Sequence, residues 1–204
     1  MNYPAFFDDA PRIRVRDPLA DFLGAAEGGV LEYRYMDAVR LAGHSCPTVA
    51  GSWLLARAAL MALYPDETAE RGGVTVSMPA PADEGVTGVM AQVFTLVTGA
   101  ASDNGFHGIG GQFVRHGLLD YADAPSAGAI RVTRTDTGAS VSVTMDLSSV
   151  PPDPEVRALM GTAMHPDADA TERAAFGKAW QDRVRRLLLE HADDPAVIRV
   201  TRLN

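Results

Sequence analysis

The sequence has almost no cysteine and no long hydrophobic run, and each shortage excludes a class of protein. Its single cysteine, Cys46, excludes an internal disulfide framework. The longest apolar run, residues 50–63, is interrupted by Ser52 and Arg57 and cannot span a bilayer. Residues 1–9 lack the basic stretch and apolar core of a secretory signal. We therefore expect a reduced, cytoplasmic location and no membrane partner.

Positive charge is also scarce. The chain has 18 Lys and Arg residues against 26 Asp and Glu residues, which gives a formal net charge of −8. The densest basic cluster, residues 183–186, falls within an amphipathic helical pattern and forms no basic patch of its own. An acidic surface repels phosphate groups, so we expect no nucleic-acid partner.

The chain nevertheless has enough apolar residues for a packed core. It is 204 residues long, and 47% of them are hydrophobic. Prolines at positions 151, 152 and 154 interrupt the sequence pattern. We predict one domain over residues 1–150 and a helical C-terminal extension over residues 151–204.

Two apolar segments predict buried helices. Residues 47–64 are apolar on nearly every side of a helix, and residues 86–97 add small residues that favour close helix packing. Alternating patterns predict four strands, at residues 73–78, 129–136, 139–145 and 196–201, of which the second and third form a hairpin and the last an edge strand.

The first third of the chain predicts three short elements. Asp17 and Pro18 begin a helix that Gly24 ends. Residues 30–35 read as a strand with Tyr33 and Tyr35 on one face. Asp37 is expected to cap a short segment that ends at residue 41.

The C-terminal extension contains a long amphipathic helix. Its apolar stripe consists of Phe176, Trp180, Val184, Leu187 and Leu188, opposite Lys178, Asp182 and Arg185. Such a stripe is typical of a core or an interface, and less so of a cofactor site, so we expect Phe176 and Trp180 on a buried face or at a dimer contact.

The strongest functional signal is the segment His44-Ser45-Cys46-Pro47. Proline is favoured at the first position of a helix, which places Cys46 at the N-cap. The positive end of a helix favours a thiolate, and the thiolate is the form that binds metals. In an extended segment His44 and Cys46 point the same way. The pair then forms half of a zinc-type coordination sphere. A buried structural cysteine beside a capping histidine is the alternative interpretation.

At residues 43–47 the sequence resembles the FmdE family, which is named after the E subunit of formylmethanofuran dehydrogenase. Members of that family carry a Gly-His-x-Cys-Pro turn followed by a long apolar helix, here residues 49–63. The resemblance continues through an acidic loop with Asp83 and Glu84, an apolar helix and the pair Thr98-Gly99. It extends over residues 35–119.

The resemblance implies an α+β domain. With the sequence patterns above, we expect a mixed sheet packed against buried apolar helices, followed by the C-terminal helical appendage. The resemblance also implies a homodimer and a divalent transition metal, most often zinc, at His44 and Cys46. The chain departs from the family at three places. It lacks the cysteine that members often have near the acidic loop, and Ala100 stands where they often have another after the Thr-Gly pair. Many members also carry a C-terminal cysteine-rich zinc finger, whereas this chain ends in a helical segment without cysteine. These departures make a role in methanofuran chemistry doubtful.

A third metal ligand is required, because two protein ligands hold a metal poorly. His107, within the glycine-rich residues 99–111, and Glu84, with its neighbour Asp83, are the candidates. His116, His165 and His191 have the sequence contexts of loops and helix ends, and we expect them outside the site. We assign His44, Cys46 and His107 as metal ligands, and Glu84 as a catalytic proton acceptor.

Three functions fit this pattern. The first is metal binding, either in an enzyme that acts on a small molecule or in a metal-binding module. The second is a metal-free thiol enzyme with Cys46 as the nucleophile and a histidine as the base. The third is a non-catalytic carrier of a metal or of a cofactor such as haem, because an imidazole and a thiolate can also ligate haem iron.

Overall fold

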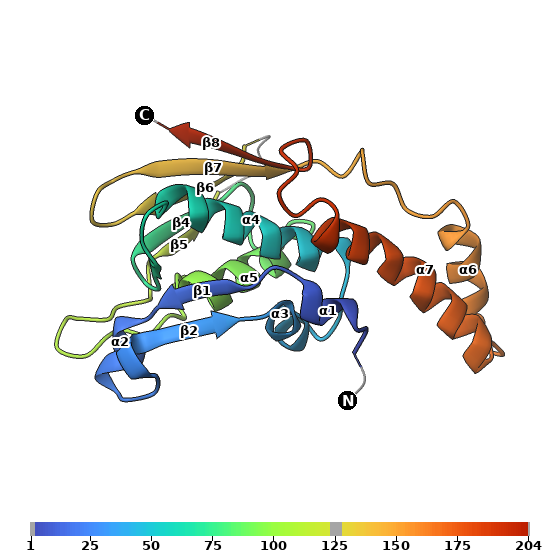
Figure 1. Ribbon diagram of the computed structural model, residues 1–204, viewed down its shortest axis with the longest axis horizontal. Coiled ribbons are helices and arrows are strands. Elements are labelled where there is room, and N and C mark those ends of the chain that lie inside the picture. Colours follow the sequence, from blue (N-terminus) through green and yellow to red (C-terminus); the bar gives the residue numbers. More distant parts are fainter. Residues whose placement is uncertain (1–2, 123–127, 204) are drawn as a thin grey trace.

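A computed structural model describes residues 3–122 and 128–203. Its centre is the helix α4 (Pro47–Leu63), which begins where the apolar pattern predicts and ends one residue earlier. The side chains of Trp53, Leu54 and Leu55 are completely or almost completely buried. Both α4 and the second apolar helix, α5 (Thr87–Thr98), lie between two sheets (Figure 1). A helix that is apolar all round needs neighbours on every side, and this layered arrangement supplies them.

The larger sheet has five strands in the order β5-β4-β6-β7-β8. The strands are β4 (Val74–Met78), β5 (Leu119–Tyr121), β6 (Ile130–Arg134), β7 (Ser140–Met145) and β8 (Ile198–Leu203). β4 and β5 are parallel and the other pairs antiparallel, so the sheet is mixed. This confirms the α+β class. The predicted hairpin is formed by β6 and β7, and β8 is an edge strand that starts two residues later than predicted.

The smaller sheet joins three strands near the N-terminus in the order β2-β1-β3. They are β1 (Ile13–Arg16), β2 (Val30–Tyr33) and β3 (Ala69–Glu70). Around them lie the short helices α1 (Phe6–Asp9), α2 (Pro18–Phe22) and η1 (Glu27–Gly29). Asp17 caps α2 as predicted, because its carboxylate accepts the backbone N–H groups of Leu19 and Ala20.

One local prediction is wrong. The strand β2 ends at Tyr33, and Tyr35 is the first residue of the helix α3 (Tyr35–Ala42), so Tyr33 and Tyr35 do not share a strand face. Asp37 is the reason: its side chain accepts the backbone N–H of Arg34 at 2.8 Å, so the helix begins at Tyr35, before Asp37 instead of after it. As the first residue of α3, Tyr35 points into the core and is fully buried.

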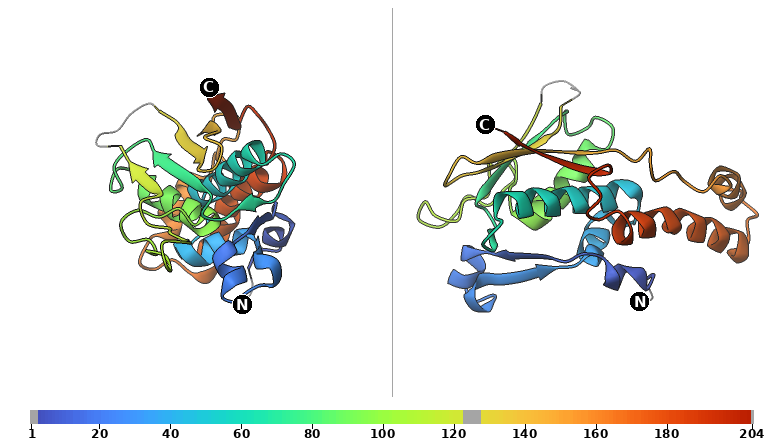
Figure 2. Two further views of the ribbon diagram at one scale, coloured as in Figure 1. Left: turned by 90° about the vertical axis from the view of Figure 1, so that its left-hand side faces the viewer. Right: turned by 45° about the horizontal axis from the view of Figure 1, so that its top comes forward.

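Beyond residue 150 the chain forms two helices and then returns to the main sheet as β8. The helices are α6 (Val156–Ala163) and α7 (Ala170–Leu189). The second half of α7 packs on α4 through the buried Val184, Leu187 and Leu188. Its first half projects from the body with α6 beside it (Figure 2). Within the described ranges, no helix is both long and apolar enough to cross a membrane.

Candidate metal-binding turn

The turn His44-Ser45-Cys46 connects α3 to α4. Gly43 ends α3 in a left-handed conformation with φ of 74°, which only glycine adopts without strain. The backbone is then extended at Cys46, with φ of −149° and ψ of 169°, and Pro47 is the first residue of α4. The sulfur of Cys46 accepts the backbone N–H of Val49 at 3.5 Å. The predicted N-cap is therefore confirmed, and the half-buried sulfur stands at the positive end of a 17-residue helix.

One ring nitrogen of His44 makes a hydrogen bond within the protein. Its Nδ1 lies 2.9 Å from the carbonyl oxygen of Ala42. A carbonyl only accepts hydrogen bonds, so in the neutral ring Nδ1 carries the proton and Nε2 carries the lone pair. The ring is exposed to solvent. His44 thus offers Nε2 as a donor atom at the surface of the turn.

Ser45, between the two candidate ligands, is held by three side chains. The indole N–H of Trp180 and the amide N–H of Gln181 both donate to its carbonyl, at 3.1 and 3.0 Å. Its hydroxyl donates to the amide oxygen of Gln181 at 3.0 Å. Since a serine hydroxyl has one proton, the Tyr35 hydroxyl, 2.9 Å away, donates to Ser45. The turn is therefore fixed by α3 and by the C-terminal helix α7 at once.

The Tyr35 hydroxyl remains protonated within this network. Burial raises the pKa of Tyr35 far above its usual value, and the hydrogen bond with Ser45 offsets only part of that effect. The nearby sulfur of Cys46, when negatively charged, raises the same pKa further. Tyr35 is thus a permanent hydrogen-bond donor beneath the turn.

Sequence reasoning missed these contacts of Ser45. It assigned Trp180 to the apolar face of its helix, and in the structure Trp180 is half-buried beside Phe176, with ring centroids 5.7 Å apart. It gave Gln181 no role. No local pattern relates Ser45 to residues about 135 positions away, so only the folded chain could identify them.

The other predicted site residues lie apart from this turn's hydrogen bonds. The His107 ring lies against the ring of His116, with centroids 4.2 Å apart and the ring planes tilted by 33°. Asp83 and Glu84 are exposed in the loop that precedes α5. Among residues 3–122 and 128–203, no group of three or more His, Cys, Asp or Glu side chains could hold a metal ion. The described fold therefore does not assemble His44, Cys46 and His107 into one three-ligand cluster.

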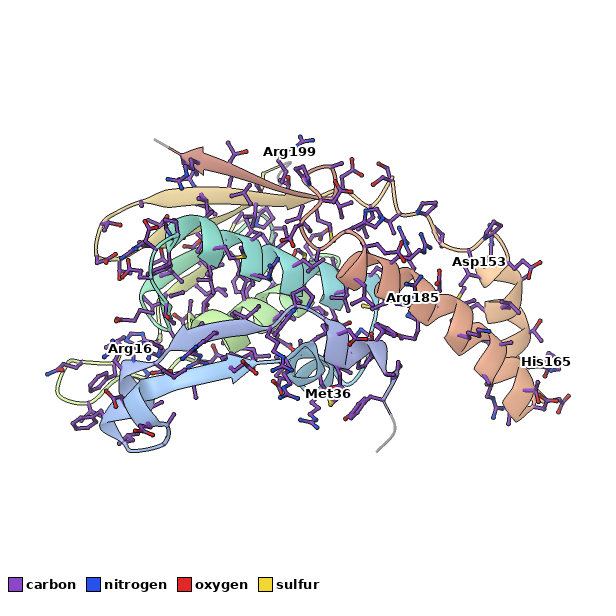
Figure 3. The ribbon with its side chains drawn as sticks, in the orientation of Figure 1. Arg16, Met36, Asp153, His165, Arg185 and Arg199 are labelled. Carbon is purple, nitrogen blue, oxygen red and sulfur yellow. The ribbon has the colours of Figure 1, made fainter. Side chains whose placement is uncertain are left out.

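The two remaining histidines sit in the contexts expected from the sequence. His165 lies at the outer end of the projecting helices, far from α3 and α4, and its Nδ1 accepts the backbone N–H of Asp167 (Figure 3). His191 follows α7, and its ring is 2.8 Å from the carboxylate of Asp194. Both have local hydrogen-bond partners.

Comparison with known proteins gives a likeness to solved structures but not to family models or curated proteins. No model of a protein family matches the chain, and no curated protein matches it. Among solved structures it is similar to the crystal structure of an FmdE-like protein from Syntrophus aciditrophicus, described as like the E subunit of a tungsten formylmethanofuran dehydrogenase. The TM-score is 0.46 and the sequence identity 13%, over 84% of this chain and 73% of that one. The chemistry of the turn rests on its own residues.

Proposed function

We propose that this protein binds one divalent transition-metal ion, most readily zinc, through Nε2 of His44 and the sulfur of Cys46. The observation that carries the proposal is the hydrogen bond from the His44 ring to the Ala42 carbonyl. Histidines that ligate metals usually donate their second ring N–H to a carbonyl or carboxylate, which orients the ring and makes the ligating nitrogen more basic. His44 has this arrangement before any metal binds.

The two donor atoms suit zinc. A thiolate sulfur and a neutral imidazole nitrogen are the commonest zinc ligands in proteins, whereas magnesium and calcium prefer oxygen donors. The sulfur of Cys46 accepts the backbone N–H of Val49 and stands at the positive end of α4. The contacts of Ser45 with Trp180 and Gln181 hold the backbone between the donors in one conformation.

Two donors leave further coordination positions to fill. We propose that water, a small-molecule ligand or a side chain of a second copy fills them, the last of these in the homodimer that the family resemblance implies. His107 and Glu84 remain the sequence-based candidates within the chain, and either would have to approach the turn. A zinc ion with an open position polarises a bound carbonyl group or activates a bound water.

Metal content of purified protein tests the proposal. Wild type prepared without chelator should contain about one metal ion per site, whereas Cys46→Ser and His44→Ala should lose most of it. Serine also caps helices, so Cys46→Ser removes the sulfur while α4 keeps its cap. His165→Ala is the matched control, because its exposed ring lies on the projecting helices. Wild-type metal content in both site variants would overturn the proposal.

Alkylation of Cys46 separates metal binding from metal-free thiol chemistry. The chain has one cysteine, so uptake of iodoacetamide reports on that sulfur alone. A bound metal should slow alkylation, and a chelator should restore it. An alkylation rate that is fast and unaffected by chelator or added zinc would favour a metal-free nucleophile instead. Turnover assays on the metal-loaded protein then distinguish an enzyme from a carrier.

A further inference from the structure

A second polar cluster lies away from the His44–Cys46 turn, where the two sheets and α5 meet. Asp17 is its centre and is only 4% exposed. One carboxylate oxygen accepts from the Arg115 guanidinium at 2.8 Å, and the other accepts from Arg71 at 2.9 Å. Two positive charges therefore share one negative charge in the protein interior. Asp17 neutralises only one of the two arginines, so this cluster carries one excess positive charge.

The backbone is shaped to admit the two arginines. Gly72 has φ of 90°, and a Cβ atom at that position would overlap the Arg115 guanidinium. Any other residue would displace that side chain. Of the buried side-chain nitrogen and oxygen atoms in the described part of the chain, Arg115 Nε alone has no hydrogen-bond partner. The cluster is thus built around positive charge that is incompletely satisfied.

Arg71 also borders a cavity of about 230 Å³. The cavity is open to solvent on one side and is bordered by the last turn of α3, by α5, by residues 102 and 104 of the glycine-rich segment and by β5. Apolar walls come from Leu41, Leu96 and Leu119. Neutral polar groups come from Gln92, Ser102 and Asn104, among others. None of the described residues that line it is an Asp, Glu or His, so Arg71 is the one charged group among them.

The guanidinium of Arg71 keeps capacity for a ligand. It has five N–H groups, of which the described bonds to Asp17, the Leu96 carbonyl and the Thr95 carbonyl engage three. The Tyr33 hydroxyl lies within reach of a fourth. The two carbonyls belong to the last turn of α5, so Arg71 also neutralises the negative end of that helix, which would otherwise repel an anion.

We propose that this cavity binds a small organic carboxylate with a short apolar body. The carboxylate pairs with Arg71 and accepts hydrogen bonds from the neutral polar side chains, and the apolar body contacts the three leucines. The guanidinium attracts a carboxylate through its charge, and its one remaining N–H can donate a hydrogen bond to a carboxylate oxygen. The single excess charge favours a monoanion over a dianionic phosphate, and the volume limits the ligand to a few carbon atoms. The inference does not depend on metal binding at His44 and Cys46.

Titration of 15N-labelled protein with butyrate tests this assignment. Amide signals of residues 91–96 and 102–104 should shift in a saturable way. Butyramide, which has the same shape without the charge, should bind at least about tenfold more weakly. Equal binding of butyrate and butyramide, or no saturable shift with butyrate, would overturn the proposal. Inorganic phosphate is the third probe, and tighter binding of phosphate than of butyrate would show that the carboxylate assignment is wrong.

Variants of the chain locate the binding. Arg71→Gln should abolish the butyrate shifts, whereas Arg199→Gln should not, because Arg199 is an exposed arginine on the edge strand β8 (Figure 3). Gln92→Trp fills the cavity from an exposed position on α5 and leaves the ion pairs intact, so it tests the site even where Arg71→Gln folds poorly. Butyrate binding that survives Gln92→Trp, or that is lost equally in Arg199→Gln, would refute the cavity as the site.

Discussion

Replacing Asp17 with asparagine should destabilise the protein strongly at neutral pH. Asparagine is nearly the same size and is itself a good helix cap, so the cap of α2 at the N–H groups of Leu19 and Ala20 can persist. The change removes the negative charge that faces Arg71 and Arg115. The buried guanidinium of Arg115 and the half-buried one of Arg71 would then lie close together without this counter-ion.

The exposed fractions of the three side chains set the size of the effect. Asp17 is 5% exposed, Arg115 9% and Arg71 20%, so water screens these ion pairs little. Removing one partner of a buried ion pair costs about 3–5 kcal/mol, because an uncompensated charge stays behind. The partial exposure of Arg71 places the loss near the lower end of that range. A domain stable by roughly 5–15 kcal/mol survives such a loss but becomes easy to unfold.

The same pair predicts a specific pH dependence. Burial by itself raises the pKa of Asp17, but the hydrogen bond from Arg71, the charge of Arg115 and the Leu19 N–H together outweigh it, so the pKa lies below 3.8. A carboxyl group with a lowered pKa in the folded state stabilises the fold above its unfolded pKa. That contribution is lost as the pH falls through the folded value. The asparagine of the variant does not titrate, so the gap between wild type and variant should close only below about pH 4.

Urea unfolding at pH 7, 5 and 3 measures this gap directly. Asp21→Asn is the matched control, because Asp21 is exposed on the same short helix and should change stability by less than about 0.5 kcal/mol. A gap below about 1 kcal/mol for Asp17→Asn at pH 7 would refute the buried ion pair as a stabilising unit. A gap that closes between pH 7 and 5 would refute the lowered pKa.

Two further predictions concern the metal-binding turn. Trp180→Phe keeps an aromatic ring but loses the hydrogen bond to the Ser45 carbonyl. It should lower the free energy of unfolding in urea by about 0.5–1.5 kcal/mol and weaken zinc binding in a competition titration. Wild-type stability and wild-type zinc affinity would together show that Trp180 does not position the turn. The assignment of His107 as third ligand predicts weaker zinc binding in His107→Ala but not in His165→Ala; equal affinity in both would remove His107 from the ligand set and make Glu84 the next candidate.

The sequence correctly predicted the structural features that depend on neighbouring residues. The N-cap at Cys46 and the start of α4 follow from a proline at the first helical position, and the cap of α2 follows from Asp17 before Pro18. The hairpin of β6 and β7 follows from alternation around a turn. Each depends on residues within a few positions of one another, so the pattern alone carries the information.

Predictions from the sequence failed where a contact between distant residues, or a side chain that bonds back to an earlier residue, determines the structure. Asp37 was recognised as a cap, but it reaches back to the Arg34 N–H, and this placed Tyr35 in a helix instead of a strand. The contacts of Gln181 with Ser45 join elements far apart in the chain. The pairing of Asp17 with Arg115 does so as well, and no periodicity signals either one.

X-ray absorption at the zinc edge of the purified, zinc-loaded protein tests the central claim most directly. We expect a first coordination shell with one sulfur at about 2.3 Å and at least one imidazole nitrogen at about 2.0–2.1 Å, from Cys46 and His44. The chain has no other cysteine, so a sulfur at that distance must come from Cys46 of this chain or of a second copy. A shell made of nitrogen and oxygen alone, with no sulfur, would contradict the account.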